Sequence, residues 1–327
     1  MNEFDFRGPL QDEMRDFILL KRSVGNKYQT EVGILRRFDQ YLVQYHPNLP
    51  DLSKEAVTGW SAKQPHEAAA NQCFRASALR QFAKYLDNLG RTAYILPTHY
   101  YPAGPQYVPH IYTPDELTRF FAQTDRCAVC VEWPSRHQVM PVFFRLLFEC
   151  GLRCSEARLL QVADVDLDAG CLTIRESKNR NSRLVMVSTT MRTRLRGYAE
   201  AVHPFPDAHA FFFPGASPGQ PMTLQNVYKN FRRFLWRAGI SHTGDGPRGH
   251  DFRHAYAVYR LKVWSEQGKD LLAMLPILKT YLGHHSFRET AYYLRMTADV
   301  FPDIRLKLEG TFGDIIPTTG GAHDETD

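Results

Sequence analysis

Four prolines interrupt the sequence between residues 94 and 112, and this interruption limits how the chain can be organised. They are Pro97, Pro102, Pro105 and Pro109. Proline lacks a backbone N–H and fixes φ, so such a stretch favours an extended, semi-rigid segment over a packed element. We therefore predict a linker at 94–112 between a domain at 1–93 and a larger one at 113–310. A chain of 327 residues, 43% of them hydrophobic, is long enough for two cores.

The N-terminal domain has the apolar spacing of amphipathic helices. Apolar side chains recur at steps of three and four residues over 28–45, and Ser53 precedes a short capped helix. A longer helix is expected over 65–89, closed by a glycine. Its predicted inward positions are Phe74, Ala78, Phe82, Tyr85 and Leu86. Its basic residues include Arg75, Arg80 and Lys84, which fit a solvated face and a DNA-facing one equally well.

The second domain opens with strong helix signals. Thr113 is followed by proline and two acids, which suit a cap and the positive end of a helix dipole. An apolar helix over 140–150 stops at Gly151, and Ser155 is expected to cap the next helix.

A hairpin and further helices complete this domain. Residues 171–175 and 183–187 have the composition of strands, joined by turn residues at 177–182. Helices are expected around 189–202, 223–238, 250–265, 270–282 and 286–295. We therefore predict a mainly α fold, with a helical N-terminal domain and a mixed α/β second domain that contains a small antiparallel sheet.

The net charge of +5 is unevenly distributed. The tail at 311–327 carries four acids and no lysine or arginine, so the rest of the chain carries +9. A basic body suits a polyanionic partner such as nucleic acid, although such a surplus is also common in proteins that bind none. We expect the acidic tail to be disordered.

Membrane and metal signals are weak. No apolar run approaches the ~20 residues that a membrane-spanning helix needs, and the acidic N-terminus is unlike a signal peptide. We therefore expect a cytoplasmic protein with its six cysteines reduced. Cys127 and Cys130 have a zinc-like spacing, but no second pair follows at a finger-like distance, so we predict no metal site and no cofactor.

Four motifs of the second domain place basic and phenolic side chains in a fixed order. They are Gly151-Leu152-Arg153-Cys154-Ser155-Glu156, Lys178 in the hairpin, His250-Asp251-Phe252-Arg253-His254, and Leu282-Gly283-His284 with Tyr293 nine residues after that histidine. Such groups can hold and attack a phosphodiester without a metal, because cationic side chains can stabilise the charge of the transition state. The six candidate residues are Arg153, Lys178, His250, Arg253, His284 and Tyr293.

The residue types suit this chemistry. Arginine can hydrogen-bond two phosphate oxygens and stays charged, and Arg153 lies beside a predicted helix N-terminus, which favours an anion. His250 and Arg253 are three residues apart, so on a helix they share a face. A phenol with a pKa of about 10 needs nearby positive charge to act as a nucleophile. Taken alone, Tyr293 would be a core aromatic residue and Lys178 a solvated turn residue.

The ordered motifs resemble those of the tyrosine recombinase (phage integrase) family. The match covers about residues 110–300, and the helical domain with its linker fits the family's core-binding, SAM-like domain. The resemblance implies a site-specific recombinase that cleaves and rejoins DNA through a 3′-phosphotyrosyl intermediate, without metal or ATP. Among recombinases, the short N-terminus favours an enzyme of a mobile element over an integrase with a separate arm-binding domain.

The resemblance also implies roles for single residues. Tyr293 is the expected nucleophile, with Tyr292 as its rival, and His284 is expected to contact the phosphate, with His285 as the alternative. Lys178 protonates the 5′ leaving oxygen. Two supporting residues are Glu156, which orients Arg153, and His254, which packs behind the site. The expected DNA-binding residues are Arg75, Arg80, Lys84 and Arg180, and Arg183 could also touch the backbone.

The implied partners are double-stranded DNA recombination sites and three further copies of the chain in a homotetramer. A need for accessory or partner recombinases stays open. The C-terminal segment, with Phe301, Ile304, Leu306 and Leu308, fits docking on its own domain and on a neighbouring protomer equally well. Two alternative functions are a type IB topoisomerase, which rejoins the original strand, and a DNA-binding protein that keeps the fold without the chemistry.

Overall fold

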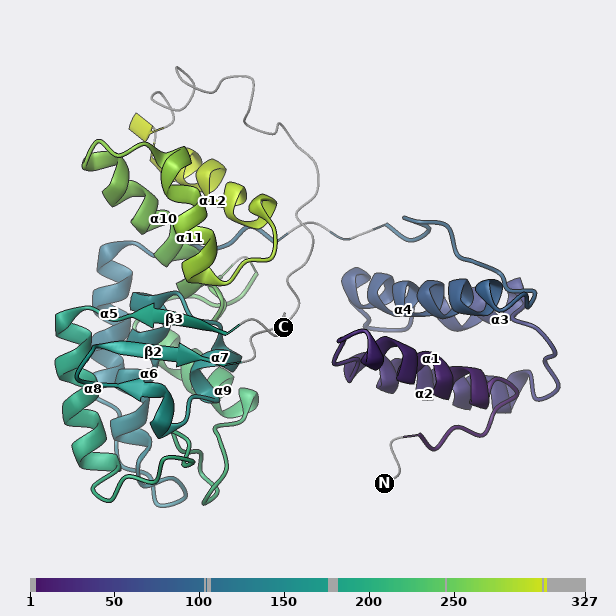
Figure 1. Ribbon diagram of the computed structural model, residues 1–327, viewed down its shortest axis with the longest axis horizontal. Helices are drawn as coiled ribbons and strands as arrows, with labels where there is room; N and C mark the ends of the chain where they lie inside the picture. The colour runs from purple at the N-terminus through teal and green to yellow at the C-terminus, as the bar shows by residue number, and fades with distance from the viewer. Residues whose placement is uncertain are drawn as a thin grey trace. The chain divides into compact units, whose positions relative to one another are not determined.

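The computed structural model describes residues 4–102, 104, 107–175, 182–244, 246–301 and 303–304. The chain divides into two compact units, Met1–Tyr107 and Val108–Asp327, and this division falls within the segment predicted as a linker (Figure 1). The described residues are mainly helical, with a small antiparallel sheet in the second unit, which confirms the predicted fold class.

The first unit packs its helices around an apolar core. They are α1 (Gln11–Ser23), α2 (Thr30–Tyr45), α3 (Lys54–Ser61) and α4 (Ala69–Asn88). As expected, the Ser53 hydroxyl accepts the N–H of Ala56 at the start of α3. Phe74 of α4 is 38% exposed, contrary to the prediction. The buried face of this helix includes Ala76, Leu79 and Ala83, and the helical period places Phe74 outside it.

The segment predicted as an extended linker packs at both ends. Leu96 is buried in the core of the first unit, and Tyr112 is buried in the second. The Arg80 guanidinium donates to the carbonyl oxygens of Leu96 at 2.7 Å and of Pro97 at 2.9 Å. The prolines predicted an extended segment, because each lacks a backbone N–H donor. They do not prevent packing, because the carbonyl oxygens can still accept hydrogen bonds and the neighbouring apolar side chains can still be buried.

The second unit combines helices with a sheet. Strands β1 (Val165–Asp166), β2 (Cys171–Ile174) and β3 (Arg183–Met186) pair antiparallel in that order. The two-residue β1 was not predicted, since a strand this short shows no alternation. The helices are α5 (Pro114–Asp125), α6 (Arg136–Cys150), α7 (Cys154–Arg158), α8 (Thr189–Val202), α9 (Leu224–Arg237), α10 (Asp251–Glu266), α11 (Leu271–Leu282) and α12 (Phe287–Val300), with a 3₁₀ turn at Val162–Asp164.

A glycine determines how α6 passes into α7. Gly151 adopts a φ of +57°, and a Cβ there would stand 2.6 Å from Cδ1 of Tyr256, so both the conformation and the space require glycine. Arg153, and not Ser155 as predicted, is the N-cap residue of α7. The Glu156 carboxylate, on the third residue of the helix, accepts the backbone N–H of the N-cap residue Arg153, as the glutamate of a capping box does.

Helix α10 belongs to both apolar clusters of the second unit. Phe252 and Ala255 pack in the cluster that also contains residues of α5, α6 and α9, whereas Ala257, Val258 and Leu261 pack in the cluster formed with α11 and α12. Figure 1 shows α10, α11 and α12 gathered beside the sheet. The first turn of α10, which carries the third sequence motif, is therefore fixed from two sides.

The described part of the C-terminal segment packs on its own unit. Ile304 is buried, and the ring of Phe301 lies 6.2 Å from that of Tyr259. Leu306, Leu308 and the acidic tail lie outside the described residues.

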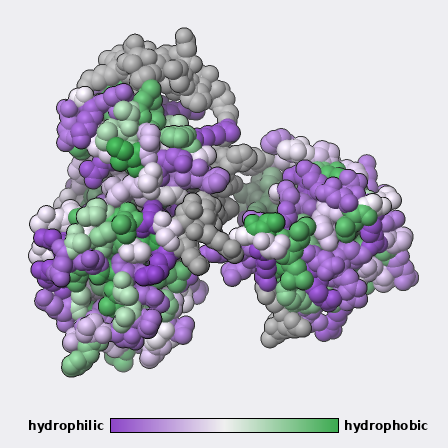
Figure 2. All heavy atoms as spheres, viewed as in Figure 1, coloured by the Kyte–Doolittle hydropathy of each residue, from purple (hydrophilic) through white to green (hydrophobic). Residues whose placement is uncertain are grey.

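The visible surface of each unit is mostly hydrophilic, with hydrophobic residues scattered in small patches (Figure 2). No helix within the described ranges is long and apolar enough to cross a membrane.

Candidate active site

The first motif forms a buried ion pair. Arg153 is 3% exposed, and its Nη1 donates to Oε1 of Glu156 at 3.1 Å. Its backbone N–H donates to the other carboxylate oxygen at 2.9 Å. Two bonds to one carboxylate hold both the turn and the guanidinium of Arg153, as expected for a residue that Glu156 orients.

Glu156 has a second cationic partner, Arg183 at the start of β3. Nη1 and Nη2 of Arg183 donate to the two carboxylate oxygens, each at 2.8 Å. Burial alone would raise the pKa of Glu156, but the hydrogen bonds and charge of Arg183, helped by the charge of Arg253, lower it to about 2. From the sequence, Arg183 was expected only as a residue that could touch the DNA backbone. The available signal was the carboxylate of the first motif, which needs a cation when buried.

Arg253 joins two of the motifs directly. It lies in the first turn of α10 and is completely buried. Its Nη1 donates to the carbonyl oxygen of Gly151 at 2.8 Å, and its Nη2 donates to that of Leu282 at 2.7 Å. The turn that carries Arg153 and the turn that carries His284 are therefore held by the same guanidinium.

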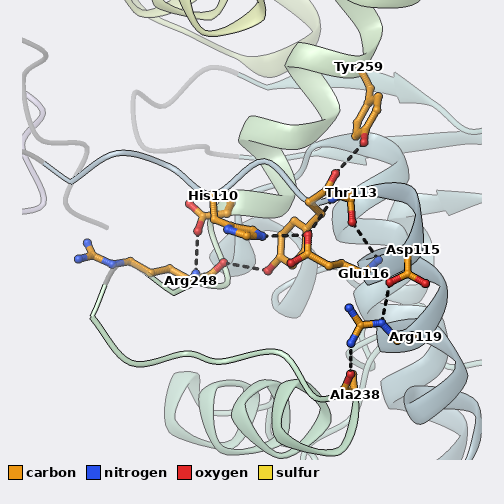
Figure 3. Close-up of polar contacts among 10 residues, drawn as sticks. His110, Thr113, Asp115, Glu116, Arg119, Ala238, Arg248 and Tyr259 are labelled. Carbon is orange, nitrogen blue, oxygen red and sulfur yellow. Dashed lines mark hydrogen bonds and ion pairs between the residues drawn. The ribbon is translucent and has the colours of Figure 1, made fainter. Parts of the chain in front are cut away.

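The start of α10 is held by a polar network that includes Arg248 and Tyr259 (Figure 3). Asp251 accepts the backbone N–H of Arg248 at 2.7 Å, and the Tyr112 hydroxyl donates to the carbonyl oxygen of Arg248 at 3.5 Å. The Tyr112 ring stacks on Phe252 with 4.8 Å between centroids, and its carbonyl oxygen accepts from the Tyr259 hydroxyl at 2.6 Å. These contacts fix the position of His250, the N-cap residue of α10.

His284 follows the glycine that ends α11. It is 6% exposed, its Nδ1 lies 2.8 Å from the Thr290 hydroxyl, and its ring stacks on that of Tyr293 with centroids 5.7 Å apart. His285 is exposed, and its backbone N–H donates to Glu289 at 3.3 Å. Of the two adjacent histidines, His284 is therefore the one beside the tyrosine.

Tyr293 of α12 lies among histidine rings. It is 2% exposed, and its ring centroid is 5.5 Å from that of His254, which in turn lies 4.8 Å from His250. Tyr292 is half-buried, and burial raises its pKa. Its described ring contact is with Tyr293 at 6.1 Å. Tyr293, and not Tyr292, is therefore the tyrosine whose described ring contacts include His254 and His284.

Five of the six candidate residues lie on the turns and helices that these contacts join: Arg153, His250, Arg253, His284 and Tyr293. Lys178 and Arg180 lie outside the described residues.

The first unit corrects one predicted DNA contact. Arg75 is 6% exposed and donates to both carboxylate oxygens of Glu67, at 2.7 and 2.8 Å. It also donates to the carbonyl oxygens of Trp60 and Ala62. The Arg75 guanidinium is thus enclosed within the first unit and is not presented to DNA. The Arg80 guanidinium donates hydrogen bonds to the carbonyl oxygens of Leu96 and Pro97, and Lys84 is exposed.

Comparisons with known proteins show to which family the chain belongs. The family model described as the phage integrase family matches residues 112–299. The Sinorhizobium fredii protein y4rE, which carries the name integrase/recombinase, is 31% identical over 299 residues, covering 89% of this chain and 93% of its own length. The tyrosine recombinase XerA of Pyrococcus furiosus is 29% identical over 302 residues, covering 91% of this chain and 93% of its own.

Solved structures of low sequence identity share the fold. The integrase of transposon Tn1549, in complex with transposon right-end DNA, gives a TM-score of 0.62 at 16% identity and covers 91% of this chain and 99% of its own. The recombinase XerH bound to its difH substrate gives 0.59 at 18%, covering 88% and 80%. The chain therefore belongs to the phage integrase family, the tyrosine recombinases, which are enzymes that cleave DNA and transfer its strands.

Proposed function

We propose that this protein is a site-specific DNA recombinase in which Tyr293 attacks the scissile phosphate. Arg153, Arg253 and His284 would surround that phosphate. The observation that carries the proposal is the pair of hydrogen bonds that Arg253 donates to the carbonyl oxygens of Gly151 and Leu282, at 2.8 and 2.7 Å. It brings residues about a hundred positions apart in the sequence to the neighbourhood of one tyrosine.

The cations supply what the reaction needs. Attack on a phosphodiester adds negative charge at phosphorus, and fixed guanidiniums stabilise that charge without reorganisation. Lys178 is the proposed acid, since an ammonium can release a proton while an arginine cannot. Tyr293 is nearly fully covered, so its hydroxyl must become accessible before it can attack DNA.

The bond changes balance without a further reactant. The Tyr293 oxygen bonds to phosphorus and the bond to the 5′ oxygen breaks. This leaves a 3′-phosphotyrosyl ester and a free 5′ hydroxyl. The phenolic proton passes to His250, and Lys178 protonates the departing oxygen. A 5′ hydroxyl from a partner duplex then attacks the ester and releases Tyr293. The number of phosphorus–oxygen bonds is unchanged, so the cycle needs no ATP.

The proposed partners are double-stranded recombination sites and three further copies of the chain. The proposed location is the cytoplasm, at the nucleoid when the enzyme is bound to DNA. Support comes from the Tn1549 integrase and XerH, which share the fold and were solved with DNA. The first unit would clamp the duplex as a core-binding domain. The transposon integrase among these neighbours favours a mobile element as the source of the sites.

The test is covalent trapping. Purified protein is incubated with nicked duplexes tiling the DNA that flanks its gene, and denaturing gels reveal protein–DNA adducts. We expect an adduct with the natural protein and with Tyr292→Phe, and none with Tyr293→Phe. The Tyr292 variant is a matched control, because it removes the same hydroxyl from the neighbouring residue.

Two outcomes would overturn the proposal. Binding in a gel shift without any adduct would identify a DNA-binding protein without the chemistry. Relaxation of a supercoiled plasmid that lacks a recombination site, with no strand exchange, would identify a topoisomerase.

A further inference from the structure

Arg183 makes an unusually complete set of contacts for a residue at the edge of a hairpin. Its side chain is 8% exposed. Nη1 and Nη2 hold the two oxygens of Glu156, each at 2.8 Å, while Nε donates to the carbonyl oxygen of Tyr281 at 2.8 Å. All three nitrogens of the guanidinium are thus occupied by two other segments of the unit.

The turn that presents His284 is shaped around this guanidinium. Gly283 adopts a φ of +69°, and a Cβ at that position would stand 2.8 Å from Nη1 and 3.1 Å from Cζ of Arg183. Glycine is therefore needed twice, once to end α11 and once to leave room for Arg183. Any shift of Arg183 would be felt directly at the residue before His284.

Arg183 and Arg253 hold the site from different elements. Arg253 connects the Gly151 turn with Leu282, whereas Arg183 connects Glu156 with Tyr281. Arg183 also belongs to the hairpin that carries Lys178, five residues before it. It therefore ties three of the four sequence motifs to one another.

The charge of Glu156 gives Arg183 a second task. This carboxylate lies 3.1 Å from Nη1 of Arg153, and its low pKa keeps it ionised in neutral solution. An anion so close lowers the positive potential that Arg153 can present to a phosphate, and the effect is strong because the cluster is buried. Arg183 places an opposite charge on the same two oxygens.

We propose that Arg183 is a positioning residue for strand cleavage. It fixes the turns that carry Arg153 and His284. It also offsets the negative charge of Glu156, so that the positive potential of Arg153 acts on the scissile phosphate. This inference rests on the proposed function, because it concerns the same phosphate site.

The first measurement is the rate of adduct formation per folded molecule for Arg183→Met and Arg183→Lys. We expect Arg183→Met to lose about 10²-fold, comparable to the removal of one transition-state donor. Arg183→Lys keeps the charge but cannot span both carboxylate oxygens and the Tyr281 carbonyl at once, so a smaller loss is expected.

The matched control is Arg145→Met. Arg145 makes the same two-pronged pair with Asp125, at 2.7 and 2.6 Å, away from the motifs. Its rate per folded molecule should equal that of the natural protein.

The deciding measurement is the double variant Arg183→Met with Glu156→Gln. Without the carboxylate, Arg153 no longer has an uncompensated anion beside it, so the double variant should cleave about tenfold faster than Arg183→Met alone.

A purely structural Arg183 would give the opposite result, since removing a second buried group would add to the damage. That outcome, or a normal rate in folded Arg183→Met, overturns the inference while the natural protein still forms its adduct. If the natural protein forms no adduct, the proposed function itself has failed.

Discussion

Each unit of the molecule buries an arginine against a glutamate, and the two arrangements differ in the balance of charge. In the first unit, Arg75 meets Glu67 alone, with 7% and 9% of the two side chains exposed. In the second, the single carboxylate of Glu156 faces both Arg153 and Arg183, and all three side chains are at most 8% exposed. The first set is neutral, whereas the second carries one net positive charge.

This difference separates a structural pair from a site. The Arg75 guanidinium is enclosed by Glu67, two carbonyl oxygens and the ring of Trp60, whose centroid lies 4.6 Å from Cζ. It joins α4 to the end of α3. The Glu156 cluster instead lies where three sequence motifs meet, and its net charge has the sign that a phosphate requires.

Breaking the first pair should cost stability but no chemistry. Replacing Arg75 by methionine leaves Glu67 buried without its partner and removes the contact with Trp60, so we expect the first unit to lose about 3–5 kcal/mol of its free energy of unfolding. Urea unfolding measures the loss. Adduct formation per folded molecule should stay within about twofold of the natural rate. A lower rate without lost stability would instead place Arg75 on the DNA.

Breaking the second cluster at Arg153 should have the reverse effect. We expect Arg153→Met to slow adduct formation by about 10²–10³-fold, equivalent to ~2.7–4 kcal/mol of transition-state stabilisation. Its free energy of unfolding should fall by only about 1–2 kcal/mol, because Arg183 still compensates Glu156. Single-turnover cleavage and urea unfolding on the same samples check both values. A stable, fully active Arg153→Met protein would contradict the comparison.

Acid should weaken the second cluster in a defined pH range. The pKa of Glu156 is lowered from 4.5 to about 2 in the folded protein, so its contribution is complete above about pH 4.5 and is lost as the pH falls towards 2. The shift corresponds to about 3 kcal/mol. The free energy of unfolding of Glu156→Gln should therefore depend less on pH across this range, by about that amount.

The first unit supplies the control for this measurement. The pKa of Glu67 is also lowered, mainly by its hydrogen bonds with Arg75. Glu67→Gln should therefore flatten the pH dependence of the first unit and leave the acid sensitivity of the second unchanged. An identical pH dependence for Glu156→Gln and the natural protein would show that Glu156 is not held as an anion.

The sequence predicted the parts of the site that depend on local order. The glycine two residues before Arg153, the spacing of His250 and Arg253, and the count from His284 to Tyr293 are all local signals. The pairing of Arg183 was not predicted, because its partner Glu156 lies 27 residues earlier and becomes its neighbour only in the folded chain. Pairing between distant charged residues is a tertiary property that a single sequence does not display.

Helix α4 shows the same limit for surface and core. The sequence placed Arg75, Arg80 and Lys84 on one candidate face, because charge alone does not indicate which side of a helix is covered. In the structure Arg75 is buried, Arg80 holds the segment around Leu96, and Lys84 is exposed. Of the three, Lys84 is the one whose charge is clearly presented to solvent.

Lys84 therefore gives the smallest and most selective test of DNA binding by the first unit. If its ammonium contacts a phosphate, Lys84→Ala should weaken binding uniformly across sequences and reduce the slope of log affinity against log salt by about 1. Its free energy of unfolding should change by no more than about 0.5 kcal/mol, since the residue is exposed. Lys63→Ala removes the same charge from the exposed loop between α3 and α4 and serves as the matched control. Equal slopes for the two variants would mean that the unit attracts DNA through its general charge. A slope for Lys84→Ala equal to that of the natural protein would mean that Lys84 does not contact a phosphate.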